Sequence, residues 1–527
     1  MSDRNKPIEN KEASELKFDR RDIVKGLATL PVLGIFYYKL WKKKALDSLK
    51  KQARLAELGV QKETPAVVKS NKPGELLRLG IIGYGGRGKA LLRGAGFAQP
   101  EWVDDRYKTA QENKLDKGLE TFLSQDDLNV VLTGVCDLFD KRAEEGIEAS
   151  INDTRPGSGT RKLDTAKRYR DYRELLVSDE VDAVIIGAPD HWHAQIILDA
   201  VKAGKHVYCE KAMTRTIEEA HAVYKAVKNS GIVFQLGHQN RQIESHFKAK
   251  EIIDNQILGP VTLVQMTTNR NSPGGAWQYD IDPEGNPQTI DWGMFQKPSP
   301  NKIPFDAERF FRWRKWYDYG TGLAGDLLSH EFDAVNQIMD LGIPSSAVAS
   351  GGIYYFKDGR DVPDVFQVAY EYPERDLTAI YSATLSSGKN RGRLFMGHDA
   401  YMEVGRGLTV TPDSGSTRYR SKIDEGLLST ALPLFTYTTG SKQIDGVTSA
   451  TAKYFAERGL LYSYRGGKRV SSTHLHIADW IYCIRNGGEP QCNIDRGFEE
   501  AIACHMATKS YQEGRKVIWD PIKREVI

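Results

Sequence analysis

The sequence predicts an α/β protein of two domains: a doubly wound parallel sheet, followed by an α+β domain with a large, mostly antiparallel sheet. Three observations predict this architecture. Short apolar runs alternate with helical patterns between residues 77 and 256, a glycine-rich turn follows the first run directly, and period-2 runs begin after Gly259-Pro260. Alternating strands and helices are typical of parallel sheets, whereas period-2 runs are typical of strands with one buried face.

Length and composition limit the function classes. A chain of 527 residues can form two domains with additional segments. Its net charge of +3 is small, and no basic stripe is interleaved with aromatic residues, so no nucleic-acid partner is expected. The five cysteines lack paired Cys-x-x-Cys spacing, and the histidines form no ligand pattern, so neither a disulfide framework nor a metal site is expected.

Residues 1–75 are expected to lie outside the fold, as a signal or anchor and a linker. The pair Arg20-Arg21 precedes an apolar stretch over residues 26–40, which resembles a twin-arginine export signal. A basic amphipathic helix is the alternative. The stretch is shorter than the roughly 20 residues that a membrane span needs. Three lysines follow it instead of a clear cleavage site, so membrane anchoring is also considered.

The first expected strand, residues 77–82, runs into a glycine-rich turn and then into a helix over residues 89–93. The turn reads Gly83-Tyr84-Gly85-Gly86-Arg87-Gly88. A G-x-G-x-x-G pattern between a strand and a helix is the fingerprint of a dinucleotide-binding Rossmann domain. Its glycines permit the tight turn, close approach to the pyrophosphate and close helix packing, while the helix N-terminus faces the phosphates. The expected cofactor ligands here are Gly83, Gly85, Gly86, Arg87 and Gly88.

Asp137 is the candidate ribose ligand. It follows the expected strand over residues 129–135, after an apparent insertion over residues 96–127, and so lies further along the chain than the usual spacing of about 20 residues. A carboxylate there accepts hydrogen bonds from both ribose hydroxyls and repels a 2′-phosphate. NAD is therefore expected in preference to NADP. Capping of the next helix is the alternative role.

Strands and helices continue to alternate up to residue 256. The expected strands cover residues 181–188, 206–210 and 233–237, and the expected helices cover residues 191–203, 217–230 and 245–256. Ligands of doubly wound sheets bind beyond the carboxyl ends of the strands. The residues that follow each strand are therefore the candidates for a binding site.

Three strand ends carry polar motifs: Pro189-Asp190-His191-Trp192-His193, Cys209-Glu210-Lys211-Ala212 and Gly237-His238-Gln239-Asn240-Arg241. With the glycine fingerprint, they resemble the Gfo/Idh/MocA family (glucose-fructose oxidoreductase, inositol dehydrogenase and rhizopine catabolism proteins). The resemblance extends from about residue 77 to the C-terminus and implies an NAD(P)-dependent oxidoreductase. Further cofactor contacts are expected from Pro189, His191, Glu210, Lys211 and Gln239.

The resemblance also implies a catalytic lysine and a catalytic Asp–His pair. In the family a Glu-Lys-Pro motif places a lysine beside the nicotinamide; here Lys211 matches and Ala212 replaces the proline. Asp326 and His330 match the pair and share one helix face. His330 is expected to be the general base and Lys211 to stabilise negative charge, with Asp326 orienting the substrate or the imidazole. A surface lysine and a solvated Asp–His pair are the alternatives.

The second domain is expected to start near residue 241. Period-2 runs cover residues 261–268, 347–355, 365–372, 377–386 and 394–396. The resemblance implies that one face of this sheet covers the active site and that the other often mediates oligomerisation, so a homo-oligomer is expected. Helices are expected over residues 477–485 and 497–511, returning to pack on the cofactor domain. His474, just before them, is expected to be packed rather than to reach the substrate.

An aromatic and basic segment, residues 309–319, precedes the Asp–His pair. Aromatic faces stack on the C–H faces of sugars, while polar groups pair with hydroxyls. Packing into the core is an equal alternative. The candidate substrate ligands are Arg241, Trp313, Trp316 and Tyr319, with Asp291-Trp292 and residues 269–283 as weaker candidates.

These expectations combine into one leading function and two alternatives. The leading function is hydride transfer between a nicotinamide cofactor and a sugar, glycoside or related polyol. The first alternative is redox-neutral glycoside cleavage, in which transient oxidation permits elimination and the hydride then returns. The second is a non-catalytic sugar-binding module, against which the retained Lys211, Asp326 and His330 argue. The location is expected to be the periplasm or the outer face of the inner membrane, with the cytoplasm as alternative.

The expected domains follow from the same pattern. They comprise residues 1–75 (signal or anchor and linker), 76–240 (Rossmann domain), 241–512 (substrate domain) and 513–527 (C-terminal tail).

Overall fold

The computed structural model describes residues 74–157, 164–438, 462–465 and 468–527, together with 41–42, 45, 53 and 55–60. The expected export signal with Arg20-Arg21 lies outside the described residues. Among the residues that are described, no helix is both long and apolar enough to cross a bilayer. The chain from Val60 onward forms one compact unit, which carries both expected sheets.

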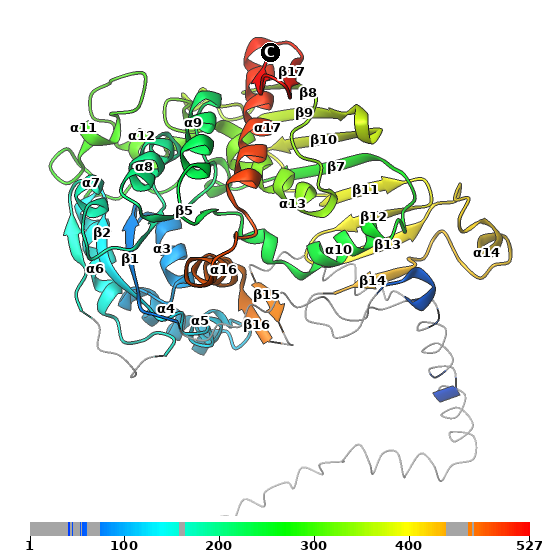
Figure 1. Ribbon diagram of the computed structural model, residues 1–527, viewed down its shortest axis with the longest axis horizontal. Coiled ribbons are helices and arrows are strands. Elements are labelled where there is room, and N and C mark those ends of the chain that lie inside the picture. The colour runs from blue at the N-terminus through cyan, green and yellow to red at the C-terminus, as the bar shows by residue number, and fades with distance from the viewer. Residues whose placement is uncertain are drawn as a thin grey trace, which may run out of the picture. The chain divides into compact units, whose positions relative to one another are not determined.

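The first sheet is parallel and has six strands in the order β3-β2-β1-β4-β5-β6 (Figure 1). This order reverses between β1 and β4, where doubly wound folds bind dinucleotides. The strands are β1 (Leu77–Ile82), β2 (Val130–Cys136), β3 (Lys167–Tyr169), β4 (Ala183–Ile186), β5 (His206–Cys209) and β6 (Phe234–Leu236). The expected fold class is confirmed for this domain. Only β3, with three residues, lacks a strand signal in the sequence.

Helices flank this sheet and enclose its core. They are α3 (Gly86–Gly94), α6 (Asp140–Ile151), α7 (Tyr172–Leu176), α8 (Asp190–Lys202), α9 (Ile217–Lys228) and α10 (Glu244–Asp254). The core under α3 contains the fully buried Leu79 and Ile81 of β1 and Val135 of β2. Ile477 and Trp480 of α16 (Ser472–Asn486) belong to the same core, so the C-terminal part of the chain packs on the first domain as expected.

The insertion between β1 and β2 folds into two helices, α4 (Pro100–Glu112) and α5 (Gly118–Leu123). Val103 of α4 and Leu119 and Phe122 of α5 form a small apolar cluster with Ala98, and Trp102 packs against it. Trp102 and Phe122 meet edge to face at 5.4 Å between ring centroids. This separate core holds the two helices together, and Trp102 stacks on Arg93 of α3.

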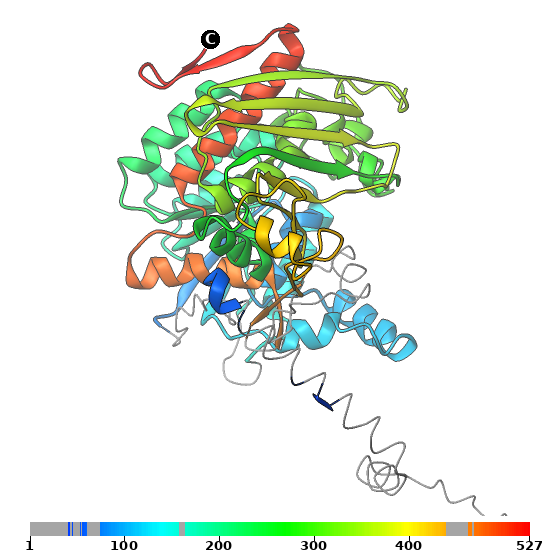
Figure 2. The same ribbon diagram turned by 90° about the vertical axis from the view of Figure 1, so that its right-hand side faces the viewer.

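The second sheet, whose strands are labelled in Figure 1 and turned by 90° in Figure 2, has ten strands in the order β14-β13-β12-β11-β7-β10-β9-β8-β17-β18. All pairings are antiparallel except β7 with β10. The strands are β7 (Val261–Asn269), β8 (Ser346–Gly352), β9 (Val365–Tyr372), β10 (Leu377–Thr384), β11 (Arg393–Gly397), β12 (Ala400–Val404), β13 (Leu408–Pro412), β14 (Phe435–Tyr437), β17 (Val517–Asp520) and β18 (Glu525–Val526).

The chain end completes this sheet. Residues 513–527 are expected as a separate tail, but β17 pairs with β8 and β18 pairs with β17. Helices α13 (Ser329–Met339) and α17 (Ile494–Glu513) pack against the sheet. The last residues therefore belong to the second domain, because their backbone groups extend the edge that β8 would otherwise expose.

The third glycine of the fingerprint gives a test of how closely α3 packs. A Cβ on Gly88 would lie 2.1 Å from the carbonyl oxygen of Gly83, whereas a Cβ on Gly86 meets nothing within 4 Å. Gly88→Ala should therefore lower the free energy of unfolding by about 3 kcal/mol, the upper end of the usual cost of overpacking. Gly86→Ala is the matched control and should change it by less than about 0.5 kcal/mol. Urea unfolding followed by circular dichroism measures both; equal stability of the two variants would contradict the packing.

Candidate active site

A cavity of about 570 Å³ opens at the carboxyl ends of β1, β2, β4 and β5. Most of the expected cofactor ligands line it. They are Gly83, Gly85, Gly86, Arg87, Asp137, Pro189, Glu210 and Lys211. Gly88 lies behind this surface, where its missing side chain lets α3 approach β1. His191 and Gln239 do not line this cavity and are discussed below.

The glycine-rich turn offers its backbone to a ligand. Gly83 has a φ of +89°, and a Cβ there would lie 2.6 Å from the backbone nitrogen of Ala188. Gly85 caps α3 without a side-chain hydrogen bond, and the first turn of the helix carries no acidic residue. Gly85 and Gly86 both line the cavity. These features fit the pyrophosphate of a dinucleotide, because helix N-terminal N–H groups attract anions.

Asp137 lies at the end of the same cavity. Its Oδ2 accepts a hydrogen bond from the backbone N–H of Tyr84 at 2.6 Å, and its Oδ1 accepts one from Phe139 at 2.9 Å. Burial raises the pKa of this carboxyl group, while Arg142 and the two N–H groups oppose that effect. Asp137 therefore stabilises the turn before α6 and also presents carboxylate oxygens to the cavity. Both of its anticipated roles are compatible with this geometry.

Lys211 and Asp326 form an ion pair between the two domains. Lys211 follows β5, and its Nζ donates to the carboxylate Oδ1 and to the backbone oxygen of Asp326, both at 2.7 Å. The two side chains are 8% and 12% exposed. An ammonium group has three N–H donors. Two of them fix the lysine on Asp326, which leaves one for a substrate oxygen.

Two further donors hold the Asp326 carboxylate. Trp277 Nε1 donates to Oδ2 at 2.8 Å, and Arg314 Nε donates to Oδ1 at 3.1 Å. Although burial raises the pKa of Asp326, Lys211 and Arg314 outweigh it and hold that pKa well below 3.8. Asp326 therefore stays ionised and orients Lys211 at any pH near neutrality.

His330 lies in the turn after Asp326. Asp326 belongs to a π-helical turn, η4 (Ala324–Leu328), that leads directly into α13, so the expected i, i+4 pair sits where the helix is locally widened. His330 Nδ1 is buried and has no hydrogen-bond partner among the described residues. Burial, Lys211 and the neighbouring His238 lower the pKa of His330 well below 6.5. The imidazole is therefore neutral at pH 7 and can accept a proton.

A buried charged cluster lies behind His330. The ring of His238 meets that of His330 edge to face at 5.5 Å. The nitrogens of His238 lie 4.0 Å from Asp333 and 3.8 Å from Glu500. Arg241, a candidate substrate ligand, instead donates to Asp333 at 2.7 Å and to the backbone of Gln491 at 3.0 Å. This corrects the expectation for Arg241, since its guanidinium neutralises a buried carboxylate.

The aromatic segment divides between cavity and core. Trp313 lines the cavity, with the guanidinium of Arg314 stacked 4.1 Å from its ring centroid. Trp316 and Tyr319 are corrected: both are buried in an apolar cluster, where Trp316 Nε1 donates to the backbone of Gly359 at 3.1 Å. Trp292, a weaker candidate, belongs to the same cluster. These rings hold residues 290–319 together and do not reach a ligand.

His191 and His474 are packing residues. His191 Nε2 bonds the backbone oxygen of Phe295 at 2.7 Å, and burial lowers its pKa to about 3. Its expected contact with the cofactor is therefore corrected, because the ring anchors the segment that carries Phe295. His474 Nδ1 bonds the backbone oxygen of Gly94 at 2.9 Å, which agrees with its expected packing role.

Several residues of the site escape sequence reasoning. Arg314 and Trp277 hold Asp326, Arg142 lines the cavity, and Asp190 accepts hydrogen bonds from the backbone and hydroxyl of Thr321 at 3.1 and 2.7 Å. Arg314 and Trp277 lie within residues 309–319 and 269–283, the segments whose composition makes them candidates for substrate binding. Their partner does not follow from composition, because the contacts join residues far apart in the chain.

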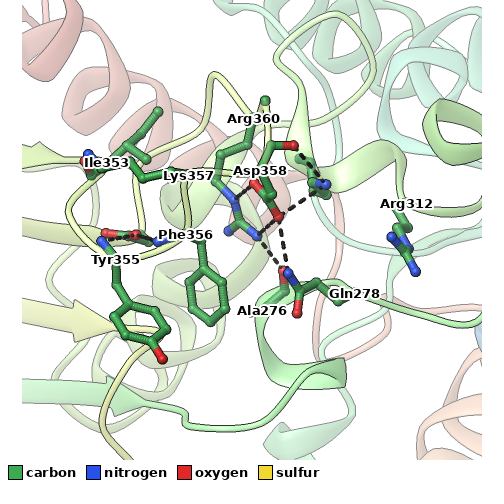
Figure 3. Close-up of polar contacts among 12 residues, drawn as sticks. Ala276, Gln278, Arg312, Ile353, Tyr355, Phe356, Lys357, Asp358 and Arg360 are labelled. Carbon is green, nitrogen blue, oxygen red and sulfur yellow. Dashed lines mark hydrogen bonds and ion pairs between the residues drawn. The ribbon is translucent and has the colours of Figure 1, made fainter.

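The two neighbours of Trp277 in the chain, Ala276 and Gln278, are held by a clamp that consists of Arg360 and Asp358 (Figure 3). The buried Arg360 donates to both carboxylate oxygens of Asp358 at 2.8 and 2.9 Å and to the backbone oxygen of Ala276 at 2.9 Å. Gln278 also donates to Asp358, at 3.2 Å. Ala276 precedes Trp277 in the chain and Gln278 follows it. The clamp therefore sets the position of the indole between them. The Nζ of the fully buried Lys315 lies 3.1 Å from Asp358.

The clamp predicts a difference between two arginine substitutions. Arg360→Met leaves Asp358 and the carbonyl of Ala276 without their main donor, and should lower the free energy of unfolding by about 3 kcal/mol. Arg173→Met, which removes an ion pair whose arginine is 51% exposed, should cost less than about 1 kcal/mol. Urea unfolding followed by tryptophan fluorescence compares them. Equal costs would show that the clamp does not hold the loop.

Comparisons with known proteins agree with this geometry. Residues 77–238 match the model of the Gfo/Idh/MocA oxidoreductase family, described as an NAD-binding Rossmann fold. A levoglucosan dehydrogenase of Pseudarthrobacter phenanthrenivorans is 27% identical over 214 residues, which are 39% of this chain and 47% of that protein. An uncharacterized oxidoreductase of Bacillus subtilis is 36% identical over 212 residues, 39% of this chain and 54% of that protein. The matches thus span about half the length of these relatives.

Solved structures extend the likeness to the fold of both domains. A levoglucosan dehydrogenase in complex with NADH and levoglucosan superposes with a TM-score of 0.54 at 19% identity, over 84% of this chain and 99% of that one. The WlbA dehydrogenase of Bordetella pertussis, in complex with NADH and UDP-GlcNAcA, gives 0.54 at 14% identity, over 85% and 99%. The glycine-lined cavity and the match of residues 77–238 together identify the first domain as a Rossmann domain that is similar to the NAD-binding domains of the Gfo/Idh/MocA oxidoreductases.

Proposed function

We propose that this protein is an NAD-dependent oxidoreductase that transfers a hydride between the nicotinamide and a sugar, glycoside or related polyol. The observation that carries the proposal is the Lys211–Asp326 ion pair at the glycine-lined cavity, with His330 one helical turn further on. The relatives support the substrate class, since they include a levoglucosan dehydrogenase and a myo-inositol 2-dehydrogenase of Thermotoga maritima.

The residues of the chain divide the work as follows. Gly85 and Gly86 would hold the pyrophosphate of NAD and Asp137 its ribose; bound NAD supplies the acceptor for the hydride. Lys211 donates its third N–H to the reacting hydroxyl oxygen and stabilises the negative charge that develops there. The neutral His330 accepts the hydroxyl proton. Asp326, held ionised by Lys211 and Arg314, keeps the ammonium group in place.

Redox-neutral glycoside cleavage is the second candidate. The specific observation that favours it is the Arg20-Arg21 pair before an apolar stretch, which resembles an export signal for folded proteins. An exported enzyme that returns its hydride to the substrate needs no supply of NAD. Release of a leaving group without accumulation of NADH distinguishes this route from net oxidation.

The same pair supports a proposal on location: the protein acts in the periplasm or is attached to the outer face of the inner membrane. Cell fractionation of the full chain and of an Arg20→Lys/Arg21→Lys variant tests this. A cytoplasmic location of the unaltered chain would contradict it.

We also propose a homo-oligomer that uses the outer face of the ten-stranded sheet. Val348 of β8 and Ile380 of β10 are 46% and 37% exposed, and both are paired in register with Ala369 of β9. They therefore form an apolar patch across three neighbouring strands. A Val348→Lys/Ile380→Lys variant should be smaller than the unaltered chain in light scattering; a monomeric unaltered chain would contradict the proposal.

Removal of the proton acceptor tests the proposed chemistry. His330→Ala should lower kcat for sugar oxidation by about 10²- to 10⁴-fold while the protein still binds NAD, because His330 acts on the substrate proton. His398→Ala is the matched control, since His398 is exposed and lies outside the cavity lining. The absorbance of reduced nicotinamide measures turnover, and calorimetry measures NAD binding. Unchanged turnover in His330→Ala would overturn the assignment.

The lowered pKa of His330 predicts the acid limb of the pH profile. Only the neutral imidazole accepts a proton, and a pKa below 6.5 keeps it neutral at every pH above that value. The apparent kcat/KM should therefore stay constant as the pH is lowered from neutral to 6.5, and it should fall only below pH 6.5. An acid limb centred at or above about pH 7 would mean that another group is the base.

A further inference from the structure

A second cavity has a volume of about 340 Å³ and adjoins the cofactor cavity at Arg87. Arg87 lines both cavities, and His330 lines the second. The walls come from α3, the inserted helices α4 and α5, the polar turn after β6 and the start of α16. Figure 1 shows α16 beside α3, and these two helices are in contact. The proposed base thus faces a chamber distinct from the one that fits the dinucleotide.

Among the described residues, the ionised side chains that line this cavity are arginines. Arg87, Arg93 and Arg406 line it, and none of the described residues that line it is an aspartate or a glutamate. Arg93 is stacked on Trp102, with its guanidinium carbon 4.9 Å from the ring centroid. Arg87 is tied to Glu210 through Nε at 2.8 Å, while its Nη2 is buried without a hydrogen-bond partner among the described residues. An anion in either of the two cavities that Arg87 lines would satisfy that donor.

The start of α16 adds backbone donors to the same cavity. Ser471 caps this 15-residue helix, and Ser471, Ser472 and Thr473 line the cavity. The first turn carries no acidic residue. Free N–H groups and the positive end of a helix attract anions. Together with the three guanidinium groups, they make the cavity a second place where negative charge is stabilised.

Neutral groups in the cavity suit a sugar ring. Trp102 and Phe122 of the insertion present aromatic surface beside Arg93, and Gln239 and Asn240 present amide groups. The Oε1 of Gln239 is buried and lacks a hydrogen-bond partner among the described residues, which fits a hydroxyl donor from a ligand. Aromatic faces pack on C–H groups while amides bind hydroxyls. The cavity therefore combines features for a ring with features for an anion.

We propose that this cavity binds the substrate and that the substrate is a sugar carrying an anionic group, a carboxylate or a phosphate, held by Arg93, Arg406 and the start of α16. The inference rests on the proposed function, in which the reacting hydroxyl lies between Lys211, which lines the cofactor cavity, and His330, which lines the second cavity. It also assigns a role to the insertion between β1 and β2. Its helices supply the aromatic wall, and Trp102 holds Arg93 in place.

The test compares matched sugars on the full chain loaded with NAD. The probes are D-glucose, D-glucuronate and D-glucose 6-phosphate, together with D-galactose and D-galacturonate. We expect either the uronates or the phosphate ester to show at least about 10-fold higher kcat/KM than the matching neutral sugar. Calorimetry should show binding that is at least about 10-fold tighter, which is the contribution expected of one charge-assisted contact. Preference for the uronates identifies the carboxylate, and preference for the phosphate ester identifies the phosphate.

Variants locate the anionic group. Arg93→Gln/Arg406→Gln should remove at least about 10-fold of the affinity for the anionic sugar and leave that for the neutral sugar within about 2-fold. Arg420→Gln is the matched control, since Arg420 is exposed on α14 (Arg420–Asp424) and lies outside the residues that line either cavity. Circular dichroism and NAD binding check that the double variant is folded.

The outcomes separate this inference from the proposed function. If neutral sugars bind and react as well as anionic ones, or if the double variant keeps the preference, the inference is overturned while the proposed oxidoreductase stands. If no anionic probe binds more tightly than its neutral counterpart, the inference is overturned as well. If anionic sugars bind through the arginines but never reduce bound NAD, the inference is supported and the proposed function is contradicted.

Discussion

The ion pair between Lys211 and Asp326 is the contact on which the proposed site depends. It joins the end of β5 in the first domain to the turn before α13 in the second, at 2.7 Å and largely out of water. A buried ion pair adds little net stability, because desolvation of both charges offsets their attraction, but loss of one partner leaves a costly unpaired charge. Its effect here is therefore geometric. Trp277 and Arg314 complete the shell of donors that orients Asp326, and the Arg360–Asp358 clamp holds Trp277.

Both cavities combine residues of the first domain with segments that lie outside its strands and main helices. Strand ends of the parallel sheet supply Gly83, Asp137 and Lys211, as the topology of doubly wound sheets requires. The segment over residues 290–319 covers the cofactor cavity through its buried aromatic cluster, and the α4–α5 insertion walls the second cavity. Arg87 lines both, so the fingerprint helix α3 connects the cofactor cavity with the cavity proposed for the substrate.

Local sequence patterns predicted the parts of the fold that local physics determines. Alternation of strands and helices predicted most of the parallel sheet. Strand ends with the family resemblance singled out Lys211 and Asp326, which the structure brings together, while the catalytic roles of these two residues and of His330 stay predictions. The sequence did not reveal β3, which is too short for periodicity to register. Arg241, Trp316 and Tyr319 have the chemistry of sugar ligands, but their neighbours decide their role: Arg241 meets Asp333, and the two rings meet an apolar cluster. Such contacts between distant residues are not encoded in any local pattern.

The most direct test of the proposed site is a single turnover of the NAD-loaded full chain with the sugar that binds it most tightly, followed by nicotinamide absorbance. We predict that reduced nicotinamide forms in the unaltered protein, where it persists for net oxidation or decays for the redox-neutral route. It should be absent in Lys211→Met although NAD stays bound. Conversion of the sugar while the bound nicotinamide remains oxidised throughout, or equal reduction in Lys211→Met, would contradict the proposed site.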